Sequence, residues 1–217
     1  GERLEQGFRT NAVDDALHRR LDAYWPPTAL MGCDRDGDAV YWNRMGVGSF
    51  AFLEEVPAGF IGRHEVYTIT RIMQALEEKG ARQKRPAMYM TVVVDLEGFD
   101  VRRISLGVIA KYKVCSRILE DYFPELVKRI VVVRAPSFVS LLWRIVGKCF
   151  DEGTRAKIQI ADARNTREAL EKFVDPAWIP EALGGSNRLA GSAYCEPLIP
   201  GSAARSVPRD LMEDILA

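Results

Sequence analysis

Hydrophobic positions along this chain fall into two kinds of run, short β-branched runs and longer stripes at helical spacing. Residues 91–94 read Thr-Val-Val-Val and residues 130–133 read Ile-Val-Val-Val, which is typical of strands buried on both faces of a parallel sheet. Apolar residues three and four positions apart indicate long helices at about 62–79 and 105–122. Strands that alternate with such helices predict an α/β domain with a mainly parallel twisted sheet.

Shorter elements complete the pattern. The sequence predicts helices at 13–24, 138–150, 151–156 and 165–173 and strands at 39–44, 88–96, 129–134 and 157–160. Gly80 is expected to end the first long helix, whose apolar stripe is Val66, Ile69, Met73 and Leu76. From Gly184 onward the chain is rich in Gly, Ser, Ala and Pro, so an extended surface tail is expected there.

Composition narrows the class of protein. The 217 residues include 30 Lys and Arg and 30 Asp and Glu, a net charge of zero, whereas a nucleic-acid-binding domain carries a basic excess. The four cysteines, at positions 33, 115, 149 and 195, form no CxxC pair, which favours reduced thiols over a disulfide frame or a zinc site. No apolar run is long enough to cross a bilayer. A cytoplasmic protein without nucleic-acid partners is expected.

Motifs for covalent chemistry are weak. The sequence contains no GxxxxGK and no GxSxG, and the two histidines, His18 and His64, are expected to be solvated surface residues. The acidic segment 34–38 is predicted to be a turn, since Met45 stands where a calcium loop needs glutamate. Asp95 and Glu97 follow a strand, so a hydrolase acid pair is conceivable, although capping of the next helix is the favoured interpretation.

Six short motifs, at residues 32–40, 94–98, 122–125, 134–136, 150–158 and 179–185, resemble in type and order those of the CRAL-TRIO family. Residues 32–40 resemble its D-x-x-G-x-P-V strand, with Ala39 in place of proline, and residues 94–98 its D-x-x-G strand end. Residues 122–125 match a Y-P-E turn and 134–136 an N-A-P or K-A-P turn. Residues 150–158 resemble F-L-x-x-x-T-x-x-K-I, and 179–185 the closing L-P-x-x-Y-G-G. The resemblance covers residues 25–185.

The resemblance implies a sheet that floors an apolar lipid pocket, flanked by helices and closed by a gate helix. It implies that residues 1–24 belong to, or link from, a helical N-terminal lobe, that 25–185 form the lipid-binding domain and that 186–217 form a C-terminal surface tail. The gate helix corresponds to residues 138–150, with Gly147 and Gly153 as hinge points. The expected gate and pocket-lining residues are Phe138, Leu141, Leu142, Ile145, Val146 and Phe150.

In family members that bind phosphatidylinositol, a glutamate of the Y-P-E turn and the threonine and lysine of T-x-x-K contact the headgroup. The resemblance places these roles on Glu125, Thr154 and Lys157. The lysine would offset the phosphate charge and the threonine would donate to a phosphate oxygen. A plain surface ion pair between Glu125 and Lys157 remains the alternative. The family also uses an arginine from the upstream lobe, which this chain does not contain.

The expected function follows from the resemblance. The chain is expected to bind one hydrophobic lipid, which could be phosphatidylinositol, phosphatidylcholine or a tocopherol-like or sterol-precursor-like molecule. It would exchange the lipid between membranes, visiting their surface transiently, without catalysis, metal or cofactor. The alternative is a lipid-regulated interaction module that recruits a small GTPase or a membrane enzyme, with further protein partners reached through domains outside this chain.

Overall fold

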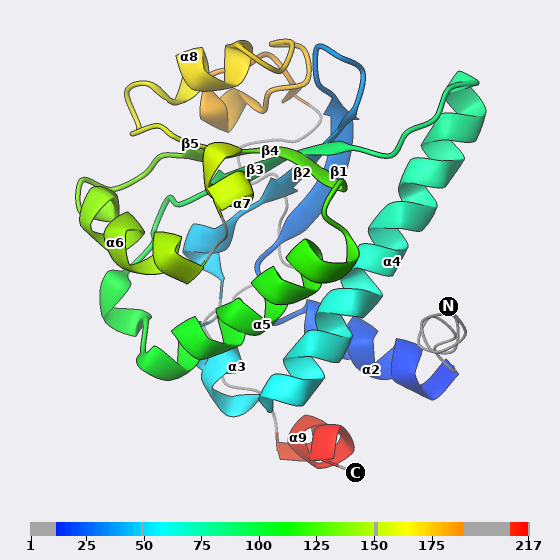
Figure 1. Cartoon of the computed structure of the whole chain (residues 1–217), viewed down its shortest axis with the longest axis vertical. Coiled ribbons are helices and arrows are strands. Elements are labelled where there is room, and N and C mark those ends of the chain that lie inside the picture. Colours follow the sequence, from blue (N-terminus) through cyan, green and yellow to red (C-terminus); the bar gives the residue numbers. More distant parts are fainter. Residues whose placement is uncertain (1–11, 49, 150–151, 189–208, 217) are drawn as a thin grey trace.

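A five-stranded sheet lies at the centre of the computed structural model of the chain, in the strand order β1-β2-β3-β4-β5 (Figure 1). The structure describes residues 12–48, 50–149, 152–188 and 209–216, and for 12–14, 140–142, 146, 149 and 211 it describes the backbone alone. The strands are β1 (Thr28–Cys33), β2 (Ala39–Asn43), β3 (Met90–Asp95), β4 (Val127–Val133) and β5 (Ile158–Ile160). β1 runs antiparallel to β2 and the other neighbours are parallel, so the predicted mainly parallel α/β fold is confirmed.

Helices connect the strands and cover both faces of the sheet (Figure 1). The α-helices are α2 (Ala12–Asp22), α3 (Phe50–Glu55), α4 (Ala58–Gln83), α5 (Leu106–Tyr122), α6 (Val139–Val146), α7 (Glu152–Ala156), α8 (Thr166–Glu171) and α9 (Arg209–Leu216). The 3-10 helices are η1 (Met45–Val47), η2 (Val101–Arg103), η3 (Gly147–Cys149) and η4 (Glu181–Leu183). Each predicted element is present with shifted ends, whereas β1, α3 and α9 are additional.

Successive side chains of the central strands point to opposite faces, and the two faces meet different surroundings. Val93, Val131 and Val133 are fully buried in a core that includes Leu170 of α8 and Ile179. The alternate positions of the same strands point toward α4, α5 and α6. One face of the sheet therefore packs as a solid core, and the other floors the cavity described below.

The first long helix differs from its prediction in length and in the residues that it buries. α4 continues through Gly80 to Gln83, and Lys84 ends it in the left-handed conformation at φ 52°. Gly80 serves close packing instead of termination, because a Cβ there would lie 2.9 Å from the carbonyl oxygen of Arg85. Met73 is 43% exposed while Ile72 is buried, so the predicted stripe was wrong by one position at that turn.

The two histidines lie inside the protein, which contradicts the prediction that they are surface residues. His18 of α2 and His64 of α4 are buried, and their Nδ1 atoms lie 2.9 Å apart. The His18 ring stacks on Tyr67 with 4.4 Å between centroids. Burial lowers the pKa of His64 to about 3, so this imidazole is neutral at physiological pH and joins the two helices.

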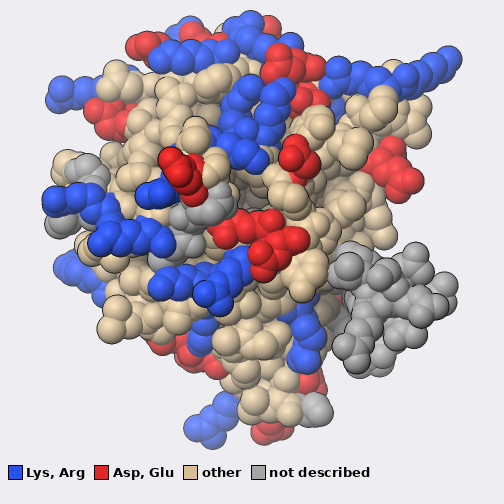
Figure 2. All heavy atoms as spheres, in the orientation of Figure 1, with Lys and Arg blue, Asp and Glu red and all other residues tan. Residues whose placement is uncertain are grey.

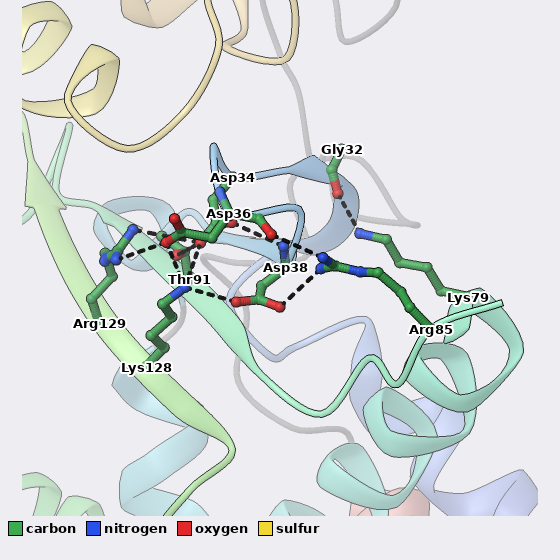
Figure 3. Close-up of polar contacts among 9 residues, drawn as sticks. All are labelled: Gly32, Asp34, Asp36, Asp38, Lys79, Arg85, Thr91, Lys128 and Arg129. Carbon is green, nitrogen blue, oxygen red and sulfur yellow. Dashed lines mark hydrogen bonds and ion pairs between the residues drawn. The ribbon is translucent and has the colours of Figure 1, made fainter. Parts of the chain in front are cut away.

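The acidic turn between β1 and β2 binds cationic side chains of the protein itself (Figure 3). Lys128 Nζ lies 2.6 Å from a carboxylate oxygen of Asp36 and 2.8 Å from one of Asp38. Asp34, whose side chain is fully buried, accepts a 2.8 Å hydrogen bond from Thr91 Oγ1. Gly37 adopts φ 84°, so the predicted turn is confirmed, and its carboxylates fasten the hairpin to β3 and β4.

The last described helix corrects the expectation of an extended tail. α9 packs beside α2: Arg20 forms ion pairs with Asp210, at 2.9 Å, and with Asp214. Ile215 is buried in the same apolar cluster as Leu21. The amphipathic spacing of these residues predicts a helix, but the Gly- and Pro-containing segment before them masked that signal.

A substitution at Gly46 tests how tightly the turn after β2 packs against the residues that follow β3. A Cβ at this position would lie 2.1 Å from the carbonyl oxygen of Glu97. We expect Gly46→Ala to lower the free energy of unfolding by about 3 kcal/mol, measured by urea denaturation, because backbone atoms must move. Gly59→Ala in α4 is the matched control, since a Cβ there meets nothing within 4 Å. This control should be neutral or stabilising by up to about 1 kcal/mol, and equal losses in both variants would contradict the packing argument.

Candidate functional site: an apolar cavity between the sheet and three helices

A cavity of about 330 Å³ lies between the sheet and helices α4, α5 and α6, within the range of about 300–1,000 Å³ typical of small-molecule pockets. The strands contribute Val94, Ile130, Val132, Ile158 and Ile160 to its floor, and α5 contributes Val108, Ile109, Tyr112, Cys115, Ser116 and Leu119. Among the described residues that line it, Glu65 is the one acidic side chain, and none is Lys, Arg or His. The lining of the cavity is therefore suited to an apolar molecule.

A small polar cluster interrupts the apolar wall between α4 and α5. The Cys115 thiol donates a hydrogen bond to the Glu65 carboxyl, and the Tyr112 hydroxyl donates to Met45 Sδ. Burial raises the pKa of Glu65 to about 7, and the thiol donor opposes that rise only in part. Burial also raises the pKa values of Cys115 and Tyr112. Near neutral pH the cluster thus carries at most a fractional negative charge.

The helix that the resemblance implies as a gate is present as α6, continued by η3, and its gating role remains a prediction. Val139, buried, and Trp143 line the cavity from this helix. Phe138 packs beside Phe99, with 6.4 Å between ring centroids. Ile145 is 55% exposed and points away from the cavity, because two residues beyond Trp143 a helix has turned by more than half. It therefore lines the outer face of α6, unlike its sequence assignment.

The other predicted gate positions are only partly placed. The side chains of Leu141, Leu142 and Val146, and all of Phe150, lie outside the described part of the chain. Gly147 has helical φ and ψ where α6 passes into η3, and Gly153 lies in the first turn of α7. Their roles as hinge points remain predictions.

The three predicted headgroup residues lie around two neighbouring turns. Lys157 Nζ donates a 3.1 Å hydrogen bond to the carbonyl oxygen of Pro124, the residue before Glu125. The backbone N–H of Lys157 donates to the carbonyl oxygen of Thr154 at 3.1 Å. Glu125 is exposed and lines a shallow surface groove beside the end of α4. The structure brings the three residues into one neighbourhood outside the apolar cavity, and their role in binding stays a prediction.

Asp95 and Glu97 act differently from the expected helix cap. Asp95 is buried and forms an ion pair with Arg134, which also pairs with Glu97. Asp95 Oδ1 additionally accepts from the backbone N–H of Glu97 at 3.0 Å, and Ser105 caps α5 in its place. Both carboxylates are thus held by one guanidinium, and they join the ends of β3 and β4 just before α6 begins.

Several lining residues escaped the sequence analysis. Glu65 falls on the buried stripe of α4, at helical spacing from Ile61, Ile69 and Leu76. A single carboxyl on an otherwise apolar stripe was the signal that could have found it. Asn43 and Trp143 also line the cavity, but nothing in their local pattern distinguishes them from other strand-end and helix residues.

The fold and the cavity define a class: an α/β domain whose sheet and helices enclose one apolar ligand pocket. A family model described as the CRAL/TRIO domain matches residues 27–185. The chain belongs to the CRAL/TRIO domain family, as its six motifs indicate.

Curated relatives and a solved structure agree with this assignment. The chain is 27% identical over 199 residues to phosphatidylinositol/phosphatidylcholine transfer protein SFH14 of Arabidopsis thaliana, covering 89% of this chain and 33% of that protein. It is 29% identical over 156 residues to protein real-time of Drosophila melanogaster, covering 70% and 24%. The chain thus spans about a third or less of these relatives. The crystal structure of Sfh5 has the same fold, with a TM-score of 0.59 at 21% identity over 86% of this chain and 62% of that one.

The raised pKa of Glu65 predicts a pH-dependent stability. A carboxyl that titrates at about 7 in the folded protein and at 4.5 when unfolded stabilises the fold below pH 4.5 and loses that contribution as the pH rises through 7. Relative to Glu65→Gln, the free energy of unfolding of the wild-type protein should fall by about 1–3 kcal/mol between pH 5 and pH 8. Urea denaturation at several pH values measures this difference. Parallel curves for the two proteins would mean that the carboxyl titrates normally.

Proposed function

We propose that the chain binds one lipid in the apolar cavity and exchanges it with membranes, without making or breaking a covalent bond. The observation that carries the proposal is the cavity itself, which is lined almost wholly by apolar side chains and covered by α6. Family membership and the names of the relatives, among them phosphatidylinositol/phosphatidylcholine transfer proteins, support it. Among the described residues, no helix has the length and apolarity to span a bilayer.

Energetics explain why exchange would take place at a membrane. Burial of each methylene contributes about 0.8 kcal/mol, so a long acyl chain contributes on the order of 10 kcal/mol. A lipid held so strongly leaves for water far too slowly to be useful. Opening of α6 against a bilayer keeps both the lipid and the inner face of the helix in apolar surroundings, which removes most of that cost.

The outer face of α6 suits such an approach. Exposed Ile145 lies beside Arg144, Lys148 and Arg155 around a shallow surface hollow. An apolar side chain ringed by cations matches a membrane surface that contains anionic lipid. Figure 2 shows Lys and Arg side chains interspersed with Asp and Glu over one face of the molecule.

Headgroup recognition would take place outside the cavity, around Lys157. Phosphate needs a cation or several N–H donors, and Lys157 Nζ, which contacts the carbonyl oxygen of Pro124, can offer two further N–H groups. Thr154 and Glu125 would contact the phosphate and the inositol hydroxyls. Lys157 immediately precedes β5, whose Ile158 and Ile160 line the cavity, so a headgroup at Lys157 and an acyl chain in the cavity are compatible.

Filling the cavity tests the lipid-binding proposal. Val94→Phe places a larger side chain on the cavity floor, and lipid loaded from phosphatidylcholine vesicles should fall at least about fivefold, because the ligand loses that volume. Native mass spectrometry of the purified protein measures the loading. Val101→Phe is the matched control, since Val101 is 38% exposed on η2. Wild-type loading by the Val94 variant, or an empty wild-type protein after incubation with vesicles, would refute the proposal and favour an interaction module.

Lys157→Ala tests the headgroup assignment. Loading of phosphatidylinositol should fall about tenfold, the loss expected for one charge-assisted contact, while loading of phosphatidylcholine should change less than about twofold. Mixed vesicles with both lipids, followed by extraction and mass spectrometry, give the ratio directly. Lys113→Ala removes an exposed cation from α5 and serves as the control. Equal losses of both lipids would mean that Lys157 supports the turn at Pro124 instead of the headgroup.

A further inference from the structure

The polar cluster inside the cavity has hydrogen-bonding capacity that the protein leaves unused. A protonated carboxyl offers one O–H donor and several acceptor positions. Among the described residues, the Cys115 thiol is the group that hydrogen-bonds Glu65, and a thiol is a weak donor. Glu65, Tyr112 and Cys115 are packed among buried residues yet keep accessible surface, because the cavity opens onto them. A ligand in the cavity can therefore reach these groups.

The opposite wall contributes a further unsatisfied polar atom. Asn43, at the end of β2, lines the cavity and pairs in register with Val94 of the floor. Its Oδ1 atom is buried and has no hydrogen-bond partner among the described residues. Buried polar atoms are normally satisfied, and leaving one unsatisfied is costly. An apolar pocket with the Glu65 cluster on one side and the Asn43 amide on another suits a ligand that brings its own polar group inside.

The charge of the cavity lining limits what that polar group can be. None of the described lining residues is Lys, Arg or His, so a phosphate would be buried there beside a carboxyl and a phenol with no cation to offset it. Such a burial is strongly unfavourable. A neutral oxygen has no such penalty. A hydroxyl is the best match, because it both donates and accepts, as does a protonated carboxyl.

We propose that Glu65, together with Tyr112 and Cys115, forms a polar subsite inside the cavity that binds a neutral oxygen of the ligand, and that the preferred ligand class is an apolar lipid alcohol held with its hydroxyl against Glu65. The inference rests on the proposed function, since it requires that the cavity hold a lipid. An ester carbonyl of an acyl lipid offers a neutral oxygen too, but it accepts only. It therefore uses the subsite only while Glu65 is protonated.

The experiment compares three probes of equal chain length that differ in their oxygen. Phosphatidylcholine vesicles containing 1-hexadecanol, methyl palmitate and hexadecane at equal mole fractions are incubated with the full chain, and the lipids bound to the recovered protein are quantified by gas chromatography. The wild-type protein should take up the alcohol in preference to the hydrocarbon. Glu65→Leu should lower that ratio about tenfold, whereas Glu78→Leu, an exposed site on the same helix, should leave it unchanged.

A pH series separates the alcohol from the ester. Uptake of methyl palmitate relative to hexadecane should fall in the wild-type protein between pH 6 and pH 8, as the carboxyl loses the proton that it donates, and should stay constant in Glu65→Gln. The glutamine variant also keeps the test valid if the leucine variant fails to fold. Preference for the ester over the alcohol at pH 6 would overturn the assignment to a lipid alcohol.

The outcomes distinguish the two proposals. A wild-type protein that takes up neither probes nor phosphatidylcholine refutes lipid binding as a whole. A wild-type protein that loads lipid, with the same alcohol-to-hydrocarbon ratio in Glu65→Leu, retains the proposed function and refutes the subsite.

Discussion

The constraint on which the rest of the structure depends is an apolar cavity that must stay open in a chain whose apolar residues favour collapse. The strands solve this by alternation. Val93, Val131 and Val133 pack solidly against the α8 side of the sheet, while Val94 and Val132 face the opening. Burial of apolar side chains on the α8 side of the sheet stabilises the domain. The domain therefore tolerates incomplete packing on the side that faces the cavity. Helices α4 and α5 form the wall of the cavity opposite the sheet. Gly62 of α4 packs closely on Val114 and Ile118 of α5, which fixes the distance between these two helices.

The start of α6 is held more firmly than the rest of the helix. Arg134, with its left-handed φ of 49°, turns the chain out of β4, forms ion pairs with Asp95 and Glu97, and donates its backbone N–H to Thr166 Oγ1 at 3.0 Å. A buried, bidentate Arg–Asp pair is costly to break. Motion of α6 would then have to take place toward its C-terminal end, near Gly147. The two family turns that flank this ion pair thus anchor the start of α6 in addition to their place in the resemblance.

The local hydrophobic pattern predicted those strands and helices whose buried positions follow from their own sequence. The β-branched runs of β3 and β4 are of this kind, and the order of the family motifs was also read from the sequence alone. The cap of α5 is different, because it was expected from Asp95 and Glu97 and is formed by Ser105. What failed depends on tertiary partners. His18 and His64 are buried only because α2 lies across α4, and α9 docks only because Arg20 and Leu21 stand opposite it. The headgroup residues were assigned by resemblance, whereas the one local signal for Glu65 was a single carboxyl on the apolar stripe of α4, and that signal does not reveal a cavity. A carboxyl on a stripe looks the same whether it meets solvent or an internal space.

Charge placement also determines how a lipid can be oriented. The cations near the cavity, Lys157 and the group around Ile145, lie outside its wall, while the described lining contains Glu65 and no cation. A phosphate is therefore stable at the rim and unstable inside, and a neutral oxygen is tolerated inside. Under the proposed function, a phospholipid would enter with its acyl chain first, whereas a lipid alcohol could enter with its hydroxyl first. In the proposed subsite a hydroxyl can meet Glu65 in either protonation state, because it both donates and accepts, whereas an ester carbonyl requires the protonated form, which a pKa of about 7 leaves only partly populated near neutral pH.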